Sequence, residues 1–168
     1  FRGVEIHSGC FLGQTRYPTS GSISSVNNLQ PAKILLGRDL PSIQIIWNGN
    51  LTNFSQFQKA HCQIGFDCDT QMLASIIANT FSQEYDLHGD LRVATIAAVR
   101  KVFDECQGGF SCLMHVEGLG LVAFRDKHGI RPLAMYTDKS LGVFGFASES
   151  RAFKGLEGVV DWVKNGEM

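Results

Sequence analysis

The sequence has no long apolar run and no excess of charge of either sign. Its apolar stretches, such as residues 43–47, fall far short of the roughly 20 residues that cross a bilayer, and no basic-then-apolar leader opens the chain. Fifteen Lys and Arg against sixteen Asp and Glu leave a formal charge of -1, which gives no support to nucleic-acid binding or to a general attraction to membranes. We therefore expect a soluble, cytoplasmic protein with no nucleic-acid partner and no membrane partner.

Cysteine occurs in an odd number and without paired C-x-x-C spacing, which argues against a disulfide framework. The five cysteines are Cys10, Cys62, Cys68, Cys106 and Cys112. We interpret them as reduced thiols that mostly fill the core, and we expect no metal and no cofactor.

The length of 168 residues, with 44% hydrophobic and 18% charged residues, is typical of one globular domain covering 1–168. No repeat or low-complexity stretch interrupts it. The chain begins at Phe1 rather than at a methionine, so we expect that residues upstream of it were cut, removed or left out.

Hydrophobic periodicity predicts two amphipathic helices and several short strands. Apolar residues recur at three- and four-residue intervals from Asp69 to Phe81 and again over 91–106. Strands are predicted at 9–15, 42–47, 110–116, 119–125, 133–137 and 141–147, with a short helix at 148–154. Strands, two helices and then a strand meander indicate an α+β fold with sheets covered by a helix layer.

The segment 15–22 follows a predicted strand and contains Arg16, Tyr17 and Thr19. Arg16 could bind a carboxylate through two parallel N–H···O bonds, and the hydroxyl and backbone N–H groups around Thr19 could complete an anion site. On local grounds alone, a solvated turn is the more common use of such residues.

Three further segments have both a structural and a functional interpretation. Asn48–Gly49 is typical of a tight hairpin turn, but an Asn amide beside a glycine N–H can also form an oxyanion hole. Asp69 could cap the first helix or receive an ammonium group, or do both. The charged segment 124–133 is interpreted locally as a hairpin with a surface ion pair.

In this order, these segments resemble the glutaminase domain of amidophosphoribosyltransferases, a class II amidotransferase with an N-terminal nucleophile. The matching strings are Thr15-Arg16-Tyr17-Pro18-Thr19-Ser20-Gly21, Gln30-Pro31, Asn48-Gly49-Asn50-Leu51, Asp69, Gly108-Gly109-Phe110, Arg125-Asp126, Gly129-Ile130-Arg131-Pro132-Leu133 and Ala147-Ser148-Glu149-Ser150. They span 15–150, nearly the whole chain. The Arg-Tyr-Pro-Thr and Gly-Ile-Arg-Pro-Leu strings favour the purine branch over the glucosamine-phosphate and asparagine synthases.

This resemblance implies a four-layer αββα sandwich that binds glutamine and releases ammonia through a thioester. By position, it assigns Arg16 to the glutamine α-carboxylate, with the 17–19 loop beside it, and Asp69 to the α-amino group. It assigns Asn48 and Gly49 to the oxyanion hole, where each donor contributes about 10²–10³ in rate in other enzymes.

Several positions depart from the family's pattern. The nucleophile, a cysteine at the mature N-terminus, has no counterpart, and Cys10 cannot replace it because it carries no free α-amine. Gln14 and Trp47 stand where the family usually has His, and Gln71 stands where it usually has Glu. A Trp47 ring would suit a ligand with a ring better than the aliphatic chain of glutamine. The N-terminal strands are expected to be missing or rebuilt, and the phosphoribosyltransferase domain is absent from the sequence.

These departures leave three hypotheses. We favour a divergent, truncated homologue without the nucleophile, recruited to a different reaction on a small polar or aromatic ligand in the former glutamine pocket. The alternative is a fragment of a working amidophosphoribosyltransferase, in which glutamine hydrolysis supplies ammonia for phosphoribosylamine in purine synthesis. A second alternative is a non-catalytic binding or assembly domain, in which exposed strands pair with another chain to give a homo-oligomer such as a dimer.

Overall fold

A computed structural model of the chain describes residues 9–15, 29–34, 36–37, 40–60 and 68–168. The elements follow in the order β1 (Ala32–Ile34), β2 (Ile43–Leu51), α1 (Phe54–Ala60), α2 (Asp69–His88), α3 (Leu91–Glu105), β3 (Gly108–Val116), β4 (Gly120–Arg125), β5 (Ala134–Asp138), β6 (Val143–Ala147), the 3₁₀ helix η2 (Ser150–Phe153) and β7 (Val159–Trp162).

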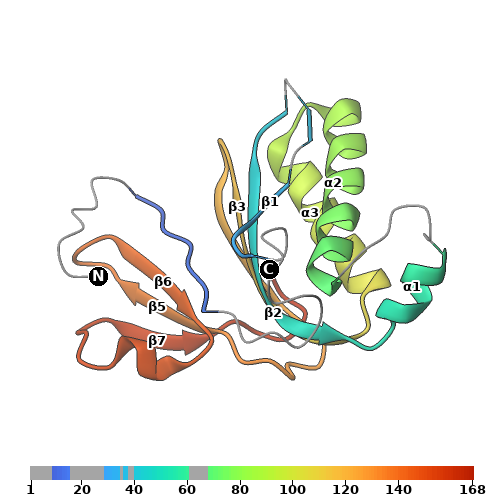
Figure 1. Cartoon of the computed structure of the whole chain (residues 1–168). Helices are drawn as coiled ribbons and strands as arrows, with labels where there is room; N and C mark the ends of the chain where they lie inside the picture. Colours follow the sequence, from blue (N-terminus) through green and yellow to red (C-terminus); the bar gives the residue numbers. More distant parts are fainter. Residues whose placement is uncertain (1–8, 16–28, 35, 38–39, 61–67) are drawn as a thin grey trace.

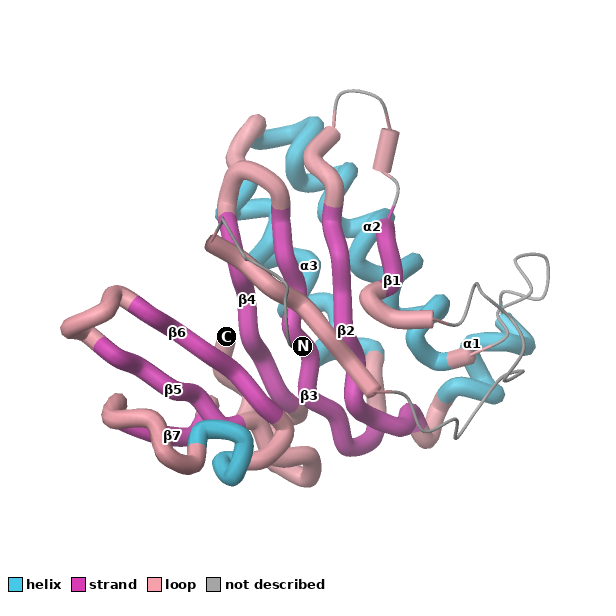
Figure 2. The backbone as a smooth tube through the Cα atoms, turned by 60° about the vertical axis from the view of Figure 1, so that its left-hand side comes forward, coloured by secondary structure: helices cyan, strands magenta, loops and turns pink. Residues whose placement is uncertain are grey.

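The strands form two antiparallel sheets that lie on opposite sides of one apolar layer. The first sheet has the order β1-β2-β3-β4 and the second has the order β6-β5-β7. Helices α2 and α3 cover one face of the first sheet, and the second sheet lies on its other side (Figures 1 and 2). The described residues therefore form three layers, a helix layer and two sheets, which confirms the α+β sandwich class.

The main core lies between α2, α3 and the first sheet. Alternate residues of β2, namely Ile43, Ile45 and Trp47, are buried on this face because successive strand residues point to opposite sides of a sheet. Helix α2 contributes the residues that the periodicity singled out, which are Met72, Leu73, Ile76, Ile77 and Phe81. Full burial of one such side chain contributes about 1.5–3 kcal/mol, so this face anchors the first sheet firmly.

A smaller apolar cluster joins the two sheets. Leu113 of β3, Ala123 of β4 and Leu133 are buried in it, and Leu12 and Phe146 of β6 pack against them. This cluster holds the second sheet against the first at one end of β6, while Phe144 at the other end of that strand is 67% exposed.

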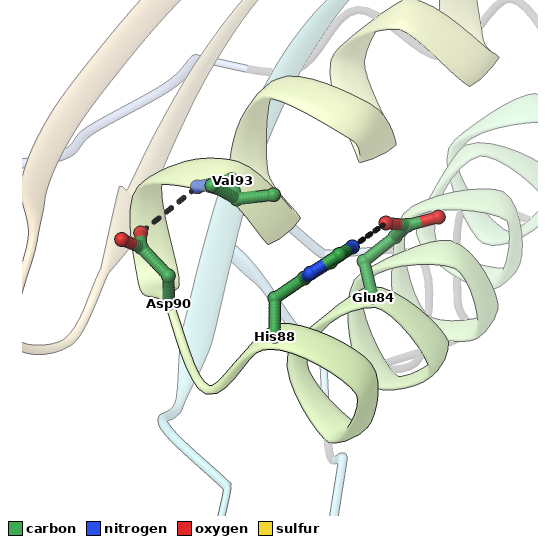
Figure 3. A network of polar contacts seen from close by, with 4 residues as sticks. All are labelled: Glu84, His88, Asp90 and Val93. Carbon is green, nitrogen blue, oxygen red and sulfur yellow. Dashed lines mark hydrogen bonds and ion pairs between the residues drawn. The ribbon is translucent and has the colours of Figure 1, made fainter.

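Local residues determine the turn between α2 and α3, because one residue ends the first helix and the next one caps the second (Figure 3). Gly89 ends α2 in the left-handed conformation, and its N–H donates to the carbonyl of Tyr85. Asp90 begins α3 by accepting hydrogen bonds from the N–H groups of Arg92 at 2.7 Å and Val93 at 3.0 Å. The pair is an antiparallel helix hairpin that packs as one layer.

The structure confirms most of the expected elements and corrects others. Both long helices are present, and the four strands expected between 110 and 147 lie at or near their predicted bounds. The expected strand at 9–15 is wrong, because this segment packs Leu12 between the sheets without joining a strand ladder. The helix expected at 148–154 is only the short η2, and β1, α1 and β7 were not predicted. No helix in the described ranges is long and apolar enough to cross a bilayer.

Candidate functional site

Asn48 and Gly49 lie within strand β2, whereas the sequence-based interpretation placed them in a turn or in a loop after a strand. Both lie inside the strand, in an unbroken register with β3 that runs from Ile43↔Val116 to Leu51↔Gly108. They form neither a hairpin turn nor a loop at the strand end. The period of two directs the Asn48 side chain toward the second sheet and the side-chain position of Gly49 toward the helices.

The backbone N–H and C=O groups of β2 also alternate along the strand, pointing toward β3 at one residue and away from it at the next. The Trp47 N–H donates to Gln30 Oε1 at 2.5 Å, and the Trp47 carbonyl accepts from Gln14 Nε2 at 2.9 Å. Gln30 lies on the β1 side, so both groups point away from β3. In an antiparallel ladder the residue two positions on repeats this orientation. The N–H of Gly49 therefore also points away from β3, next to the Asn48 side chain.

The Trp47 ring belongs to the main core, and Trp47 is also among the residues that line the candidate cavity. Its side chain is 3% exposed and stacks on Phe110, with ring centroids 4.6 Å apart and planes inclined by 24°. Strand alternation explains this placement, because Trp47 shares the helix-facing side of β2 with Ile45. The ring therefore packs beneath the strand that carries Asn48, and a contact between Trp47 and a ligand stays a prediction.

Gln30 connects two elements of the site. Besides accepting from the Trp47 N–H, it donates through Nε2 to Thr70 Oγ1 at 3.3 Å, in the first turn of α2. Gln30 belongs to a matched string without a predicted role, and Gln14 is one of the departures from the family's pattern. The signal that could have identified both is their amide chemistry, since a Gln side chain has the donor and the acceptor of a peptide group.

A cavity of about 620 Å³ lies between the two sheets and reaches the first turn of α2. Asn48 and Gly49 line it from β2, Ser148 lines it from the end of β6, and Asp69 lines it from the first residue of α2. Asp69 is 5% exposed. Cys68 is the N-cap of α2, so the prediction that Asp69 caps this helix misses by one residue.

Charge in this cavity comes from one residue of each sign among the described lining residues, Asp69 and Arg131. Arg131 belongs to a matched string but was not predicted as a site residue. The predicted anion-site residues Arg16, Tyr17 and Thr19 lie outside the described residues.

The segment after β4 is organised around a buried carboxylate, and it also makes a surface ion pair between Lys127 and Asp104 at 3.6 Å. Asp126 is 1% exposed and its carboxylate accepts four backbone N–H groups. The donors are Phe110 at 3.1 Å, His128 at 2.9 Å, Ile130 at 3.1 Å and Arg131 at 3.2 Å. Burial alone would raise the pKa of Asp126, but the four donors outweigh it and hold the pKa below its ordinary value.

Arg125, the neighbour of this carboxylate, also turns away from solvent. It is 8% exposed and donates to the carbonyls of Val163 at 3.1 Å and Gly129 at 2.5 Å. Arg125 and Asp126 therefore each bind backbone groups, and these two sets of bonds fix the loop that carries Arg131.

Two buried cysteines, Cys106 and Cys112, do not have the properties of activated nucleophiles. Burial raises the pKa of Cys106 to about 12 and raises the pKa of Cys112 further, so both stay protonated at neutral pH. Cys10 is exposed and does not line the cavity. Among the described residues, no group of three or more His, Cys, Asp or Glu side chains is placed to hold a metal ion.

Comparisons with known proteins agree with this geometry. The family model of the glutamine amidotransferase domain matches residues 23–155. The amidophosphoribosyltransferase of Pasteurella multocida is 35% identical over 98% of this chain and 33% of its own length. That of Haemophilus influenzae is 36% identical over 89% of this chain and 30% of its own length. The chain therefore spans about a third of the length of these relatives.

Solved structures give the same fold. The glutamine phosphoribosylpyrophosphate amidotransferase of B. subtilis, complexed with ADP and GMP, matches with a TM-score of 0.66 and 21% identity over 90% of this chain and 30% of its own. At this identity the match speaks for the fold alone. Together with the family match, these findings identify the chain as a member of the glutamine amidotransferase domain family, in the form that resembles the glutaminase part of amidophosphoribosyltransferases.

Proposed function

We propose that this chain is the glutamine-binding domain of an amidophosphoribosyltransferase and that glutamine occupies the cavity between the two sheets. The observation that carries the proposal is the pairing, in one cavity, of the Asp69 carboxylate with the Asn48 side chain and the outward Gly49 N–H. Free glutamine has an ammonium group, a carboxylate and a neutral amide. Asp69 suits the ammonium group, and the Asn48–Gly49 donors suit the amide oxygen.

Two arginines are candidates for binding the carboxylate of the ligand. The family resemblance gives it to Arg16, while Arg131 is the cation that lines the described part of the cavity. A guanidinium binds a carboxylate through two parallel hydrogen bonds, so either residue suits this role chemically. Replacing each arginine separately distinguishes the two.

Glutamine is favoured over a new aromatic ligand because the case for such a ligand depended on the Trp47 ring. That ring is stacked on Phe110 in the core and only 3% of Trp47 is exposed, so it offers little surface to a ligand although Trp47 lines the cavity. The similarity to amidophosphoribosyltransferases over 98% of the chain also supports the working-enzyme hypothesis more than recruitment to another reaction.

The chemistry that this arrangement serves is the release of ammonia from the glutamine amide, for transfer to a phosphoribosyl acceptor. When a thiolate attacks the amide carbon, negative charge develops on the amide oxygen, and Asn48 Nδ2 and the Gly49 N–H would stabilise it. The nucleophile is not assigned to Cys106 or Cys112, since both thiols stay protonated. The role proposed for these 168 residues is thus to bind and orient glutamine.

Isothermal titration calorimetry of the chain with glutamine tests the proposal, with glutamate as the matched control ligand. We expect glutamine to bind and glutamate to bind at least roughly 10-fold more weakly, because the second carboxylate of glutamate brings another negative charge into the cavity that holds Asp69 and has no N–H group to donate. Asp69→Asn should weaken glutamine binding by roughly 10-fold or more, since hydrogen bonds to charged groups contribute about 1.5–3 kcal/mol. Arg16→Ala and Arg131→Ala identify the carboxylate partner.

Circular dichroism spectra and melting curves of every variant establish that it is folded. Absence of glutamine binding by the folded wild-type chain would overturn the proposal. Equal affinity for glutamine and glutamate would remove the role of Asn48 and Gly49 as partners of a neutral amide.

A further inference from the structure

Ser148 lies where the second sheet meets the Asn48 side chain. It directly follows β6, whose last residue, Ala147, is paired with Ala134 of β5, and it lines the cavity. Its position is therefore fixed by the strand pairing of the second sheet, although its surface is exposed. No role was predicted for it beyond its place in a matched string.

A hydrogen bond connects Ser148 to the candidate oxyanion hole. Asn48 Nδ2 donates to Ser148 Oγ at 3.2 Å, between residues 100 positions apart in the sequence. The amide nitrogen has two N–H groups. One is directed to Ser148, and the other remains for a ligand in the cavity.

The Asn48 amide needs such a partner because a second hydroxyl competes for it. Ser111 of β3 is directly opposite Asn48 in the strand register, lies on the same face of the sheet and also lines the cavity. Side chains that are directly opposite in an antiparallel pair have Cβ atoms about 4.5–5.5 Å apart. An unrestrained Asn48 amide, which rotates broadly about its terminal torsion, could turn toward Ser111 and away from the ligand.

We propose that Ser148 is a positioning residue that holds the Asn48 amide in the orientation required for an oxyanion hole. Ser148 does not touch the reacting atoms, and it acts through Asn48. This inference depends on the proposed function for its meaning, because the oriented N–H serves a glutamine amide oxygen. The hydrogen bond itself can be measured without any ligand.

Nuclear magnetic resonance of the ¹⁵N-labelled chain follows the Asn48 side-chain amide directly, after its signals are assigned by their loss in Asn48→Ala. In Ser148→Ala we expect these two proton signals to shift and their chemical-shift difference to change, while Ser148→Thr, which keeps the hydroxyl, restores them. Ser150→Ala is the matched control, since Ser150 is exposed and lies two residues farther along, and it should leave the Asn48 signals unchanged.

Glutamine titrations of the same variants measure the consequence. One neutral hydrogen bond contributes a factor of about 2 to 10 in affinity, so Ser148→Ala should weaken binding by that factor and Ser148→Thr should recover most of it. Unchanged Asn48 signals in folded Ser148→Ala would overturn the inference, whatever the glutamine result. Shifted signals with unchanged glutamine affinity would also overturn it, while leaving the glutamine proposal intact. Absence of binding by the wild type would overturn the proposed function alone, and the Asn48 signals would still decide the hydrogen bond.

Discussion

Replacing Gly49 with alanine should destabilise the fold through packing alone. A Cβ built at Gly49 would lie 2.6 Å from Phe110 Cβ, 2.9 Å from the Gly109 carbonyl oxygen and 2.9 Å from Trp47 Cε2. Ordinary contacts of a Cβ begin at 3.4 Å, so the shortest of these contacts is about 0.8 Å too close. Gly49 is extended and needs no special backbone conformation, so its requirement for glycine is one of space.

The surroundings of Gly49 cannot adjust cheaply. Phe110 is its direct partner in β3, and a Cβ atom moves only with its own backbone. Relief of the contact would therefore separate β2 from β3 or displace the stacked rings of Trp47 and Phe110. Overpacking of this kind costs about 1–3 kcal/mol, and we expect the upper part of that range because two of the three contacts involve Cβ or backbone atoms.

Urea unfolding followed by far-ultraviolet circular dichroism measures this cost. With a slope of about 1–3 kcal/mol per molar urea, Gly49→Ala should lower the unfolding midpoint by roughly 1 M. Gly9→Ala is the matched control, because a Cβ at Gly9 meets nothing within 4 Å, and its unfolding free energy should stay within about 0.5 kcal/mol of the wild type. A Gly49→Ala midpoint equal to that of the control would refute the packing argument and leave Gly49 with a role only in the oxyanion hole.

Two further predictions follow from the pKa values of buried groups. The pKa of Asp126 is depressed in the folded chain below its ordinary 3.8, so its stabilisation is complete above that value and is lost as the pH falls through the folded pKa. Asp126→Asn should lose about 1–3 kcal/mol at pH 7 and show a flatter decline of unfolding free energy below pH 4, and an unchanged slope would contradict this. Iodoacetamide at neutral pH should alkylate exposed Cys10 at least roughly 10-fold faster than Cys106, whose pKa is raised to about 12. Peptide mass spectrometry would contradict this if the two rates were equal.

Sequence patterns predicted those helices and strands that bury one apolar face and expose the other. Helix α2 was found from its apolar positions because they repeat at the helical period and all pack on the first sheet. By contrast, β7 carries exposed residues throughout, among them Val159 at 70% exposed, and β1 has only three residues. Neither shows a repeated apolar face, so periodicity could not reveal them.

The sequence predicted which residues share the candidate site but not how they are arranged, and the chemical roles of these residues stay predictions. The family resemblance identified Asn48, Gly49 and Asp69, and all three line one cavity. It could not show that Asn48 lies within a strand, since an Asn-Gly pair has the local preference of a turn and only the pairing with β3 overrides it. The direction of the Trp47 ring likewise follows from its position in β2, which the residue type alone does not determine.

The pairing between β1 and β2 is short, and this leaves backbone groups farther along β2 without a partner strand on that side. This ladder ends at Ile45, and at Trp47 two glutamine side chains take the place of a neighbouring backbone. A ligand oxygen at the Gly49 N–H would occupy the next place along that edge, so ligand and polypeptide compete for the same hydrogen-bonding position. An extended peptide alongside β2 that reached Gly49 would accordingly compete with such a ligand, and this competition would come from its backbone rather than from its side chains.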